Sequence, residues 1–295
     1  MVTNNKKIKI FTNFILILLS LTCLLPLFLL IASSFTEEKS LAVNGYSFFP
    51  KSLSLDAYRY IWTSRIQIIK AYGITLIVTL CGTAVNIIIT TLMAYPLSRK
   101  DLPGRNIFSF YIFFTMLFNG GLVPTYMMYS QMHIKDTIFA LIIPTLLVNA
   151  YYVIMMRTYF SSNLPNEFIE AAKVDGASEL RILMKIVVPL SKPVMGTVAL
   201  LVGISYWNDW QNGLYYLVKR TDLFSIQNLL NRMITSAEFL SNPANQAMFR
   251  QAGEKIPSVG IRMAIAVIAL LPILAMYPFF QKAFVKGITV GGVKG

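Results

Sequence analysis

Long apolar stretches recur along the whole chain, and they limit its fold more than any other feature. The 295 residues are 56% hydrophobic and only 13% charged, a balance unlike that of soluble domains. An α-helix needs about 20 mostly apolar residues to cross the roughly 30 Å hydrocarbon core of a bilayer. The sequence predicts six such spans, at about residues 11–32, 71–97, 107–129, 137–160, 193–217 and 259–280. We therefore expect an all-α integral membrane protein that forms a single transmembrane domain over residues 1–295.

The first apolar run has a second interpretation. Lys6, Lys7 and Lys9 precede it, and Ala32 and Ser33 near its end are small enough for a cleavage site, as in a secretory signal peptide. The run is longer than the usual apolar region of such a peptide, however, and five more spans follow. We therefore favour an uncleaved first helix.

The net charge of +13 would suggest nucleic acid as a partner in a soluble protein. Here much of the basic excess flanks the spans, where Lys and Arg contact anionic membrane lipid and fix topology. Six spans place both termini on one side. The short basic turn 98–106 contains Arg99, Lys100 and Arg105 and favours the cytoplasmic side for itself and both termini. Cys23 and Cys81 lie within apolar spans and imply no disulfide framework.

The segment 161–192, between the fourth and fifth spans, is polar and predicts two helices. Pro165 suits the first position of a helix, and Glu167 suits its positive end. Phe168, Ala171, Ala172 and Asp175 follow at helical spacing, so we expect them to share one face.

The first helix of this segment should stop at Gly176, because glycine adopts the left-handed conformation that ends many helices. Ser178 can cap the second helix. In that helix Leu180, Leu183 and Val187 are spaced as an apolar stripe, and Pro189 should end it.

Two interpretations of this segment are open from periodicity. Its amphipathic helices could rest on lipid headgroups. Alternatively, Glu170-Ala-Ala, then Asp175-Gly-Ala, then Ile186 and Pro189 resemble the EAA loop of binding-protein-dependent ABC importer permeases. The resemblance implies a coupling helix that docks in a cleft of an ATP-binding subunit. The ATPase-coupling residues that it implies are Glu170, Ala171, Ala172, Asp175, Gly176, Ala177 and Pro189.

Sequence motifs for catalysis do not occur in this chain. It contains no G-x-x-x-x-G-K-[ST] phosphate loop, no H-E-x-x-H and no C-x-x-C, and it has a single histidine, His133. We therefore expect no enzyme activity, no catalytic or metal site and no cofactor in this chain, with ATP bound by partner subunits. The one acid inside a predicted span is Asp209, which argues against an ion-driven carrier.

The stretch Trp207-Asn208-Asp209-Trp210 lies near the outer end of the fifth predicted span. It could belong to an interfacial aromatic belt. It could also form a sugar platform, with flat rings against pyranose faces and Asn208 and Asp209 accepting hydroxyl protons. Asn149, in the fourth predicted span, is either an interhelical hydrogen-bonding residue or a substrate contact. These five residues are the candidates for the substrate pathway.

Several stretches indicate the type of importer. The aromatic stretch just described, Gly120-Gly-Leu-Val-Pro124 and the glycine-rich end from Lys286 to Gly295 resemble the oligosaccharide branch of the family. Within it, the chain resembles the LplC-like permeases, similar to the second permease of maltose-type systems. The resemblance implies a homologous permease subunit, two ATP-binding subunits and an extracytoplasmic solute-binding protein, in a bacterial cell (inner) membrane. The alternative is a secondary carrier or channel that works without ATPase subunits.

The predicted outer loop 218–258 is too long for a tight connection between spans. It could cap the outer mouth of the helix bundle. Alternatively, as the resemblance to maltose-type permeases implies, its second part could reach into the docked binding protein, with Phe249, Arg250 and Glu254 as contacts.

Overall fold

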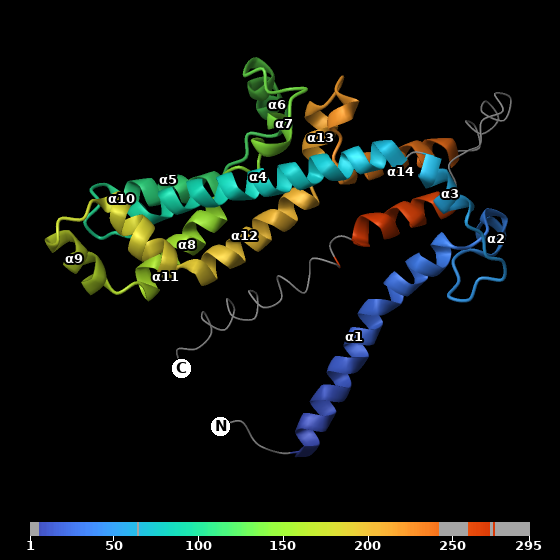
Figure 1. The fold of residues 1–295 in the computed structure, drawn as a ribbon, viewed down its shortest axis with the longest axis horizontal. Helices are drawn as coiled ribbons and strands as arrows, with labels where there is room; N and C mark the ends of the chain where they lie inside the picture. Colours follow the sequence, from blue (N-terminus) through green and yellow to red (C-terminus); the bar gives the residue numbers. More distant parts are fainter. Residues whose placement is uncertain (1–5, 64, 242–258, 272–273, 275–295) are drawn as a thin grey trace. The chain divides into compact units, whose positions relative to one another are not determined.

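The computed structural model describes residues 6–63, 65–241, 259–271 and 274, and these residues are mainly helical (Figure 1). Within this part of the chain the only β-structure is an isolated bridge between Thr36 and Leu53. The described residues fall into two compact units. One holds the residues up to Ile66 and those from Leu230 onward, and the other holds Gln67–Leu229. The all-α prediction is confirmed for the described residues.

The first unit contains α1 (Lys6–Ser34), α2 (Glu38–Asn44), α3 (Asp56–Thr63) and the helix Val259–Leu271. Ser34 and Tyr58 share a hydrogen bond of 2.8 Å between their hydroxyls. The Glu38 carboxylate accepts the backbone N–H groups of Val259 and Gly260 at 3.1 and 3.2 Å. These N–H groups begin a helix and have no partner within it, so a negative side chain stabilises them.

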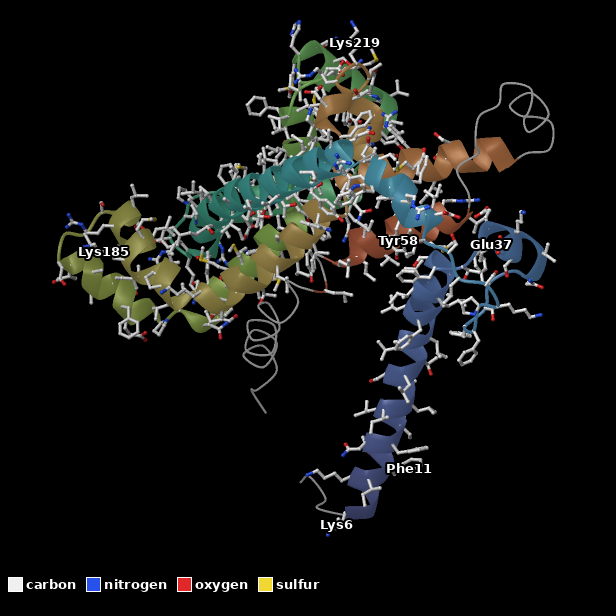
Figure 2. All side chains as sticks on the ribbon, turned by 45° about the vertical axis from the view of Figure 1, so that its right-hand side comes forward. Lys6, Phe11, Glu37, Tyr58, Lys185 and Lys219 are labelled. Carbon is white, nitrogen blue, oxygen red and sulfur yellow. The ribbon has the colours of Figure 1, made fainter. Side chains whose placement is uncertain are left out.

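Helix α1 carries apolar side chains on every side. None of the residues in its most apolar stretch is buried, and Phe11, for example, is 64% exposed (Figure 2). A helix that is apolar all round suits a membrane span or a buried position better than water.

Length and composition identify two described helices that could cross a membrane, Ile8–Ser34 in α1 and α4 (Arg65–Ser98). Two bent helix pairs would raise the number to four if each pair is one span. The described part of the predicted sixth span, Val259–Leu271, is a shorter apolar helix. The count of six spans and the single-domain boundary of 1–295 therefore stay predictions.

The second unit is built around α4, which lies alongside α5 (Arg105–Leu117), α8 (Ala150–Asn163) and α12 (Lys192–Trp207) (Figure 1). Helix α8 packs against both α5 and α12. The core between these helices contains fully buried residues from three of them: Ala94, Val153, Met156 and Val198.

The predicted third span, 107–129, is divided into α5 and α6 (Leu122–Gln131), which are bent by 113° relative to each other. The Asn119-Gly120-Gly121 sequence makes the break. Gly121 has φ +86°, a conformation that glycine adopts without steric cost, and the Asn119 side-chain oxygen accepts the N–H of Gly121 at 2.8 Å.

The predicted fourth span, 137–160, is also interrupted. It begins with α7 (Phe139–Ile142) and resumes as α8 at Ala150. Pro144 lacks the N–H that a continuous helix needs, and Thr145 has φ +61°. Side chains from other helices donate hydrogen bonds to the freed backbone carbonyls. Tyr206 donates to Ile142 (2.8 Å), Asn212 to Pro144 (3.0 Å) and Asn86 to Leu146 (2.8 Å). Such pairing is what allows irregular backbone within an apolar segment.

The predicted fifth span, 193–217, corresponds to α12 followed by the separate helix α13 (Gln211–Tyr216). Helix α13 packs against α7. A 3-10 turn, Thr221–Leu223, and helix α14 (Ile226–Ser241) follow. These two elements occupy the described part of the predicted outer loop.

Candidate functional site

The predicted coupling segment begins with α9 (Asn166–Val174). Pro165 lies one residue before the helix, as its N-cap, with φ −63° and ψ 128°, so the prediction that it opens the first turn was wrong by one position. The predicted stop is confirmed: Gly176 has φ +74°. Its N–H donates to the Lys173 carbonyl at 3.0 Å, and the N–H of Ala177 donates to the Ala172 carbonyl at 2.9 Å. This pair of bonds is the Schellman motif that glycine makes possible.

Ser178 caps the second helix of the segment, as predicted. Its side-chain oxygen accepts the N–H of Arg181 at 3.4 Å. The helix consists of α10 (Glu179–Ile182), a π-helical turn (Leu183–Val187) and α11 (Val188–Leu190). It then bends by 81° into α12.

Two details of this helix differ from the prediction. Pro189 lies inside α11 instead of ending the helix. A proline ring crowds the carbonyl four residues earlier, and the wider π-helical turn gives that carbonyl more room. Leu183 and Val187 of the predicted apolar stripe are buried, as expected, but Leu180 is 64% exposed and Ile182 is fully buried in its place.

The two helices of the segment line an open pocket of about 450 Å³, which we call the loop pocket. Phe168, Ala171, Ala172 and Asp175 of α9 form one wall, so the prediction that these four share a face is confirmed. Lys185, Ile186, Pro189 and Leu190 form the other wall. Glu170 is exposed and is not among the residues that line this pocket. Ala177 is half-buried beyond the end of α9.

An ionic network joins the coupling segment to the turn between α4 and α5. The Lys173 ammonium lies 3.0 Å from the Asp101 carboxylate and 2.8 Å from the Glu179 carboxylate. The Tyr95 hydroxyl donates to the second oxygen of Glu179 at 2.6 Å. Arg99 pairs with Asp101 at 3.3 Å.

This network changes the acid–base properties of its members. The hydrogen bond to Glu179, and then the one to Asp101, hold the pKa of Lys173 above its usual range. The hydrogen bond from Lys173 lowers the pKa of Asp101. Lys173 and Asp101 are therefore both charged at neutral pH. Sequence reasoning missed the network because its members are up to 84 residues apart and no local pattern connects them.

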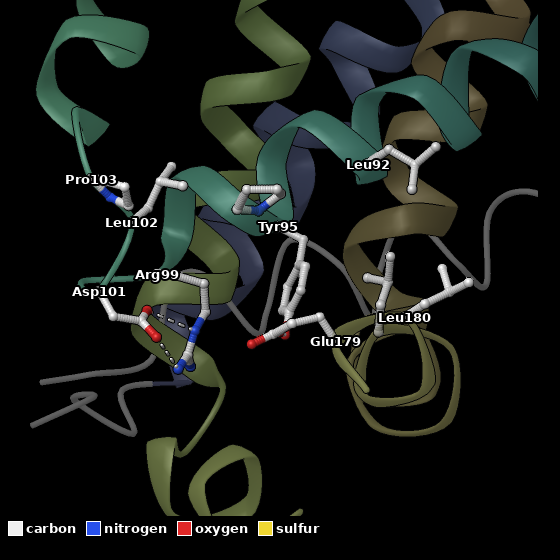
Figure 3. A pocket seen from close by; sticks show the side chains of 10 residues that line it. Leu92, Tyr95, Arg99, Asp101, Leu102, Pro103, Glu179 and Leu180 are labelled. Carbon is white, nitrogen blue, oxygen red and sulfur yellow. Dashed lines mark hydrogen bonds and ion pairs between the residues drawn. The ribbon is translucent and has the colours of Figure 1, made fainter. Parts of the chain in front are cut away.

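Beside the network lies an open groove of about 350 Å³, which we call the turn groove (Figure 3). Leu92, Leu102 and Leu180 contribute apolar lining, and Tyr95 and Glu179 meet at its edge. The groove is thus formed jointly by α4, the α4–α5 turn and α10.

The structure places the four residues of the predicted sugar platform at the junction of α12 and α13. Trp207 is only 5% exposed, and its indole N–H has no hydrogen-bond partner among the described residues. Asn208 is exposed and accepts a hydrogen bond from Gln227 at 3.3 Å. Asp209 accepts the N–H of Asn212 at 3.3 Å. Trp210 is half-buried and precedes the first residue of α13.

Asn149 is the N-cap of α8, and its side-chain oxygen accepts the N–H of Tyr151 at 2.9 Å. It lies at the end of the interrupted segment and not inside a continuous span. The remaining candidates, Phe249, Arg250 and Glu254, lie outside the described residues. Within the described part of the chain, no cluster of three or more His, Cys, Asp or Glu side chains could hold a metal ion.

Apolar helices long enough to cross a membrane, joined by an exposed polar helical hairpin, define the class: an integral membrane protein. Comparison gives the family. The family described as "Binding-protein-dependent transport system inner membrane component" matches residues 2–290, and the chain belongs to it. It is thus a permease subunit of an ABC importer and not an enzyme.

Known proteins of similar sequence support this assignment. The chain is 38% identical over 280 residues to the polygalacturonan/rhamnogalacturonan transport system permease protein YtcP of Bacillus subtilis (strain 168), covering 95% of this chain and 96% of that protein. It is 39% identical over 272 residues to protein LplC of the same organism, covering 92% of this chain and 90% of that protein.

A solved structure is also similar. It is a crystal structure of a bacterial ABC transporter involved in the import of the acidic polysaccharide alginate, and the TM-score to one of its chains is 0.77. The sequence identity is 28%, and the match covers 96% of this chain and 98% of that one.

Proposed function

We propose that this chain imports an oligosaccharide, as one of two homologous permease subunits that work with two ATP-binding subunits and an extracytoplasmic solute-binding protein. The observation that carries the proposal is the geometry of the coupling segment. Helix α9 ends in a Schellman motif at Gly176, and the loop pocket opens between α9 and residues 185–190. A short, exposed helix with a fixed end is well suited to insert into a cleft of another protein.

The proposed coupling residues have different tasks. Gly176 and Ala177 close the turn, while Ala171, Ala172, Asp175 and Pro189 line the loop pocket. Glu170 is exposed, and we propose that it pairs with a basic residue of the ATP-binding subunit. ATP is bound by that partner, and this chain needs no cofactor of its own.

We propose that the substrate is an oligosaccharide that contains uronic acids. The names of two similar proteins support this: one is a polygalacturonan/rhamnogalacturonan transport system permease, and the other belongs to a transporter involved in the import of the acidic polysaccharide alginate. Trp207, Asn208, Asp209, Trp210 and Asn149 remain our candidates for the substrate pathway. Asn208 and Trp210 keep exposed surface for a ligand, whereas the indole N–H of Trp207 is buried and unpaired among the described residues.

We propose six spans in a bacterial cell (inner) membrane, with both termini in the cytoplasm. The contact between Lys173 and Asp101 supports this orientation, because it brings the basic α4–α5 turn and the coupling segment to the same side. The basic turn and the coupling segment each favour the cytoplasmic side, and both lie at the same end of the helices. Phe249, Arg250 and Glu254 are proposed contacts of the binding protein on the opposite side.

Two measurements test the proposed function. The chain is purified from its own membrane in mild detergent, and we expect an ATP-binding subunit and a second permease to co-purify. Uptake is then measured in a strain that lacks the chain, with uronate-containing and neutral oligosaccharides of equal length. We expect loss of uptake for the uronate series. A chain that purifies alone and still supports transport would establish the carrier alternative.

A further inference from the structure

We propose that Tyr95, Asp101, Lys173 and Glu179 form a latch that makes the coupling segment and the cytoplasmic end of α4 move as one body. Lys173 and Glu179 are then positioning residues, which transmit movement of the ATP-binding subunits to the spans. This inference rests on the proposed function, and it assigns the transmitting contacts within this chain.

Lys173 is the centre of the latch, since its ammonium group contacts carboxylates from two different parts of the chain. Glu179 is the first residue of α10, and its contact at 2.8 Å closes the turn between α9 and α10. Asp101 belongs to the turn between α4 and α5, and its contact at 3.0 Å joins α9 to that turn. A bond to Glu179 alone would stabilise only the loop, whereas the bond to Asp101 connects the loop to the span.

Tyr95 provides the second connection, from α4 directly to α10. Its side chain is 5% exposed and its hydroxyl donates to Glu179 at 2.6 Å. The Glu179 carboxylate therefore divides its oxygens between Lys173 and Tyr95. A buried tyrosine fixed by packing holds its hydroxyl in one place, so the contact is more rigid than one between two long surface side chains.

Apolar packing supports these polar contacts. Ile182 and Leu183, one helical turn after Glu179, are buried in the same core as Tyr95. Figure 3 shows Tyr95 reaching toward Glu179 from α4, with Arg99 and Asp101 paired on the adjacent turn. The Tyr95–Glu179 contact and the apolar core thus join α10 to α4, and the Lys173–Asp101 contact joins α9 to the turn that follows α4. Single exposed ion pairs contribute little to stability. Here the contacts share Lys173 and Glu179, so together they restrain the orientation of α9 and α10 relative to α4.

The experiment measures whether the two parts move together. Cys23 and Cys81 are replaced by serine in the full complex, and spin labels are attached at Lys100→Cys on the α4–α5 turn and Val174→Cys on α9, both exposed positions. The distance between the labels is measured by pulsed electron resonance without nucleotide and with trapped ATP. We expect one narrow distribution that is the same in both states.

Variants of the latch separate positioning from simple stability. We expect Lys173→Met and Glu179→Gln to broaden the distance distribution and to reduce uptake per ATP hydrolysed by about fivefold, at the lower end of usual coupling. Lys173→Arg should preserve both, because a guanidinium can also contact two carboxylates. Tyr159→Phe is the control, since its hydroxyl makes only a 3.4 Å contact with the Leu190 carbonyl.

Two results would overturn the latch. One is a label distance that changes between the nucleotide-free and ATP-trapped states of the unmodified latch. The other is a Glu179→Gln complex with the original distance distribution and uptake per ATP. Failure of the proposed function is seen separately, as the absence of a co-purified ATP-binding subunit from the unlabelled chain.

Discussion

Replacement of Gly176 by valine should uncouple transport from ATP hydrolysis. Gly176 has φ +74°, and a Cβ built on it would meet nothing within 4 Å. The expected effect therefore comes from the backbone alone and not from a clash. A non-glycine residue in the left-handed region costs roughly 1–2 kcal/mol, and a β-branched residue there costs about 2–3 kcal/mol.

This cost acts on the Schellman motif that fixes the end of α9, because the bonds from Gly176 to Lys173 and from Ala177 to Ala172 need the left-handed residue. Each 1.4 kcal/mol changes an equilibrium constant about tenfold. A cost of 2–3 kcal/mol therefore lowers the population of the native loop conformation, relative to other conformations, by roughly 30- to 150-fold. The spans are far from this turn in sequence, so insertion in the membrane should be normal.

The assay is ATP hydrolysis by the reconstituted complex with and without substrate-loaded binding protein, together with uptake. We expect Gly176→Val to abolish the stimulation and the uptake, and Gly176→Asn to retain most of both, because asparagine tolerates the left-handed conformation. Gly73→Val is the matched control, since Gly73 in α4 also has open space around its Cβ position and no positive φ. Full uptake in Gly176→Val, or equal damage by asparagine and valine, would refute the reasoning.

Three further predictions concern other parts of the chain. Trp210→Ala should reduce uptake without reducing assembly of the complex, measured by transport and by co-purification; a loss of assembly instead would favour the aromatic-belt interpretation. Gly82→Ala should destabilise the chain by about 1–3 kcal/mol, because the new Cβ would lie 2.5 Å from the Tyr206 ring; thermal unfolding in detergent measures it, and an unchanged midpoint would contradict the packing. The Asp136 carboxylate accepts the N–H groups of residues 218–220 at 2.7–3.2 Å, and these bonds, that of Lys219 first, hold its pKa below the usual range. Its contribution to stability is therefore complete above the ordinary carboxyl pKa of about 4 and is lost as the pH falls through the lowered value; in Asp136→Asn this pH dependence of unfolding should be absent, and an identical pH profile would contradict the assignment.

The sequence by itself determined the features that depend on neighbouring residues. Apolar content predicted a helical membrane protein, and residue types at fixed short spacing predicted the ends of the coupling helices. Gly176 and Ser178 act as predicted because backbone conformation and capping are local properties. The shared face of Phe168, Ala171, Ala172 and Asp175 follows from helical periodicity alone.

Only the tertiary structure decided which distant groups meet. Asn86 donates to the Leu146 carbonyl, 60 residues away, and Tyr95 donates to Glu179, 84 residues away. Asn149 became a helix cap because the fourth predicted span is interrupted before it. A polar group freed within an apolar segment must find a partner, but which helix supplies the partner depends on packing. Spacing along the chain contains no information about that packing, so the interruption, its hydrogen-bond donors and the network around Lys173 had to come from the fold.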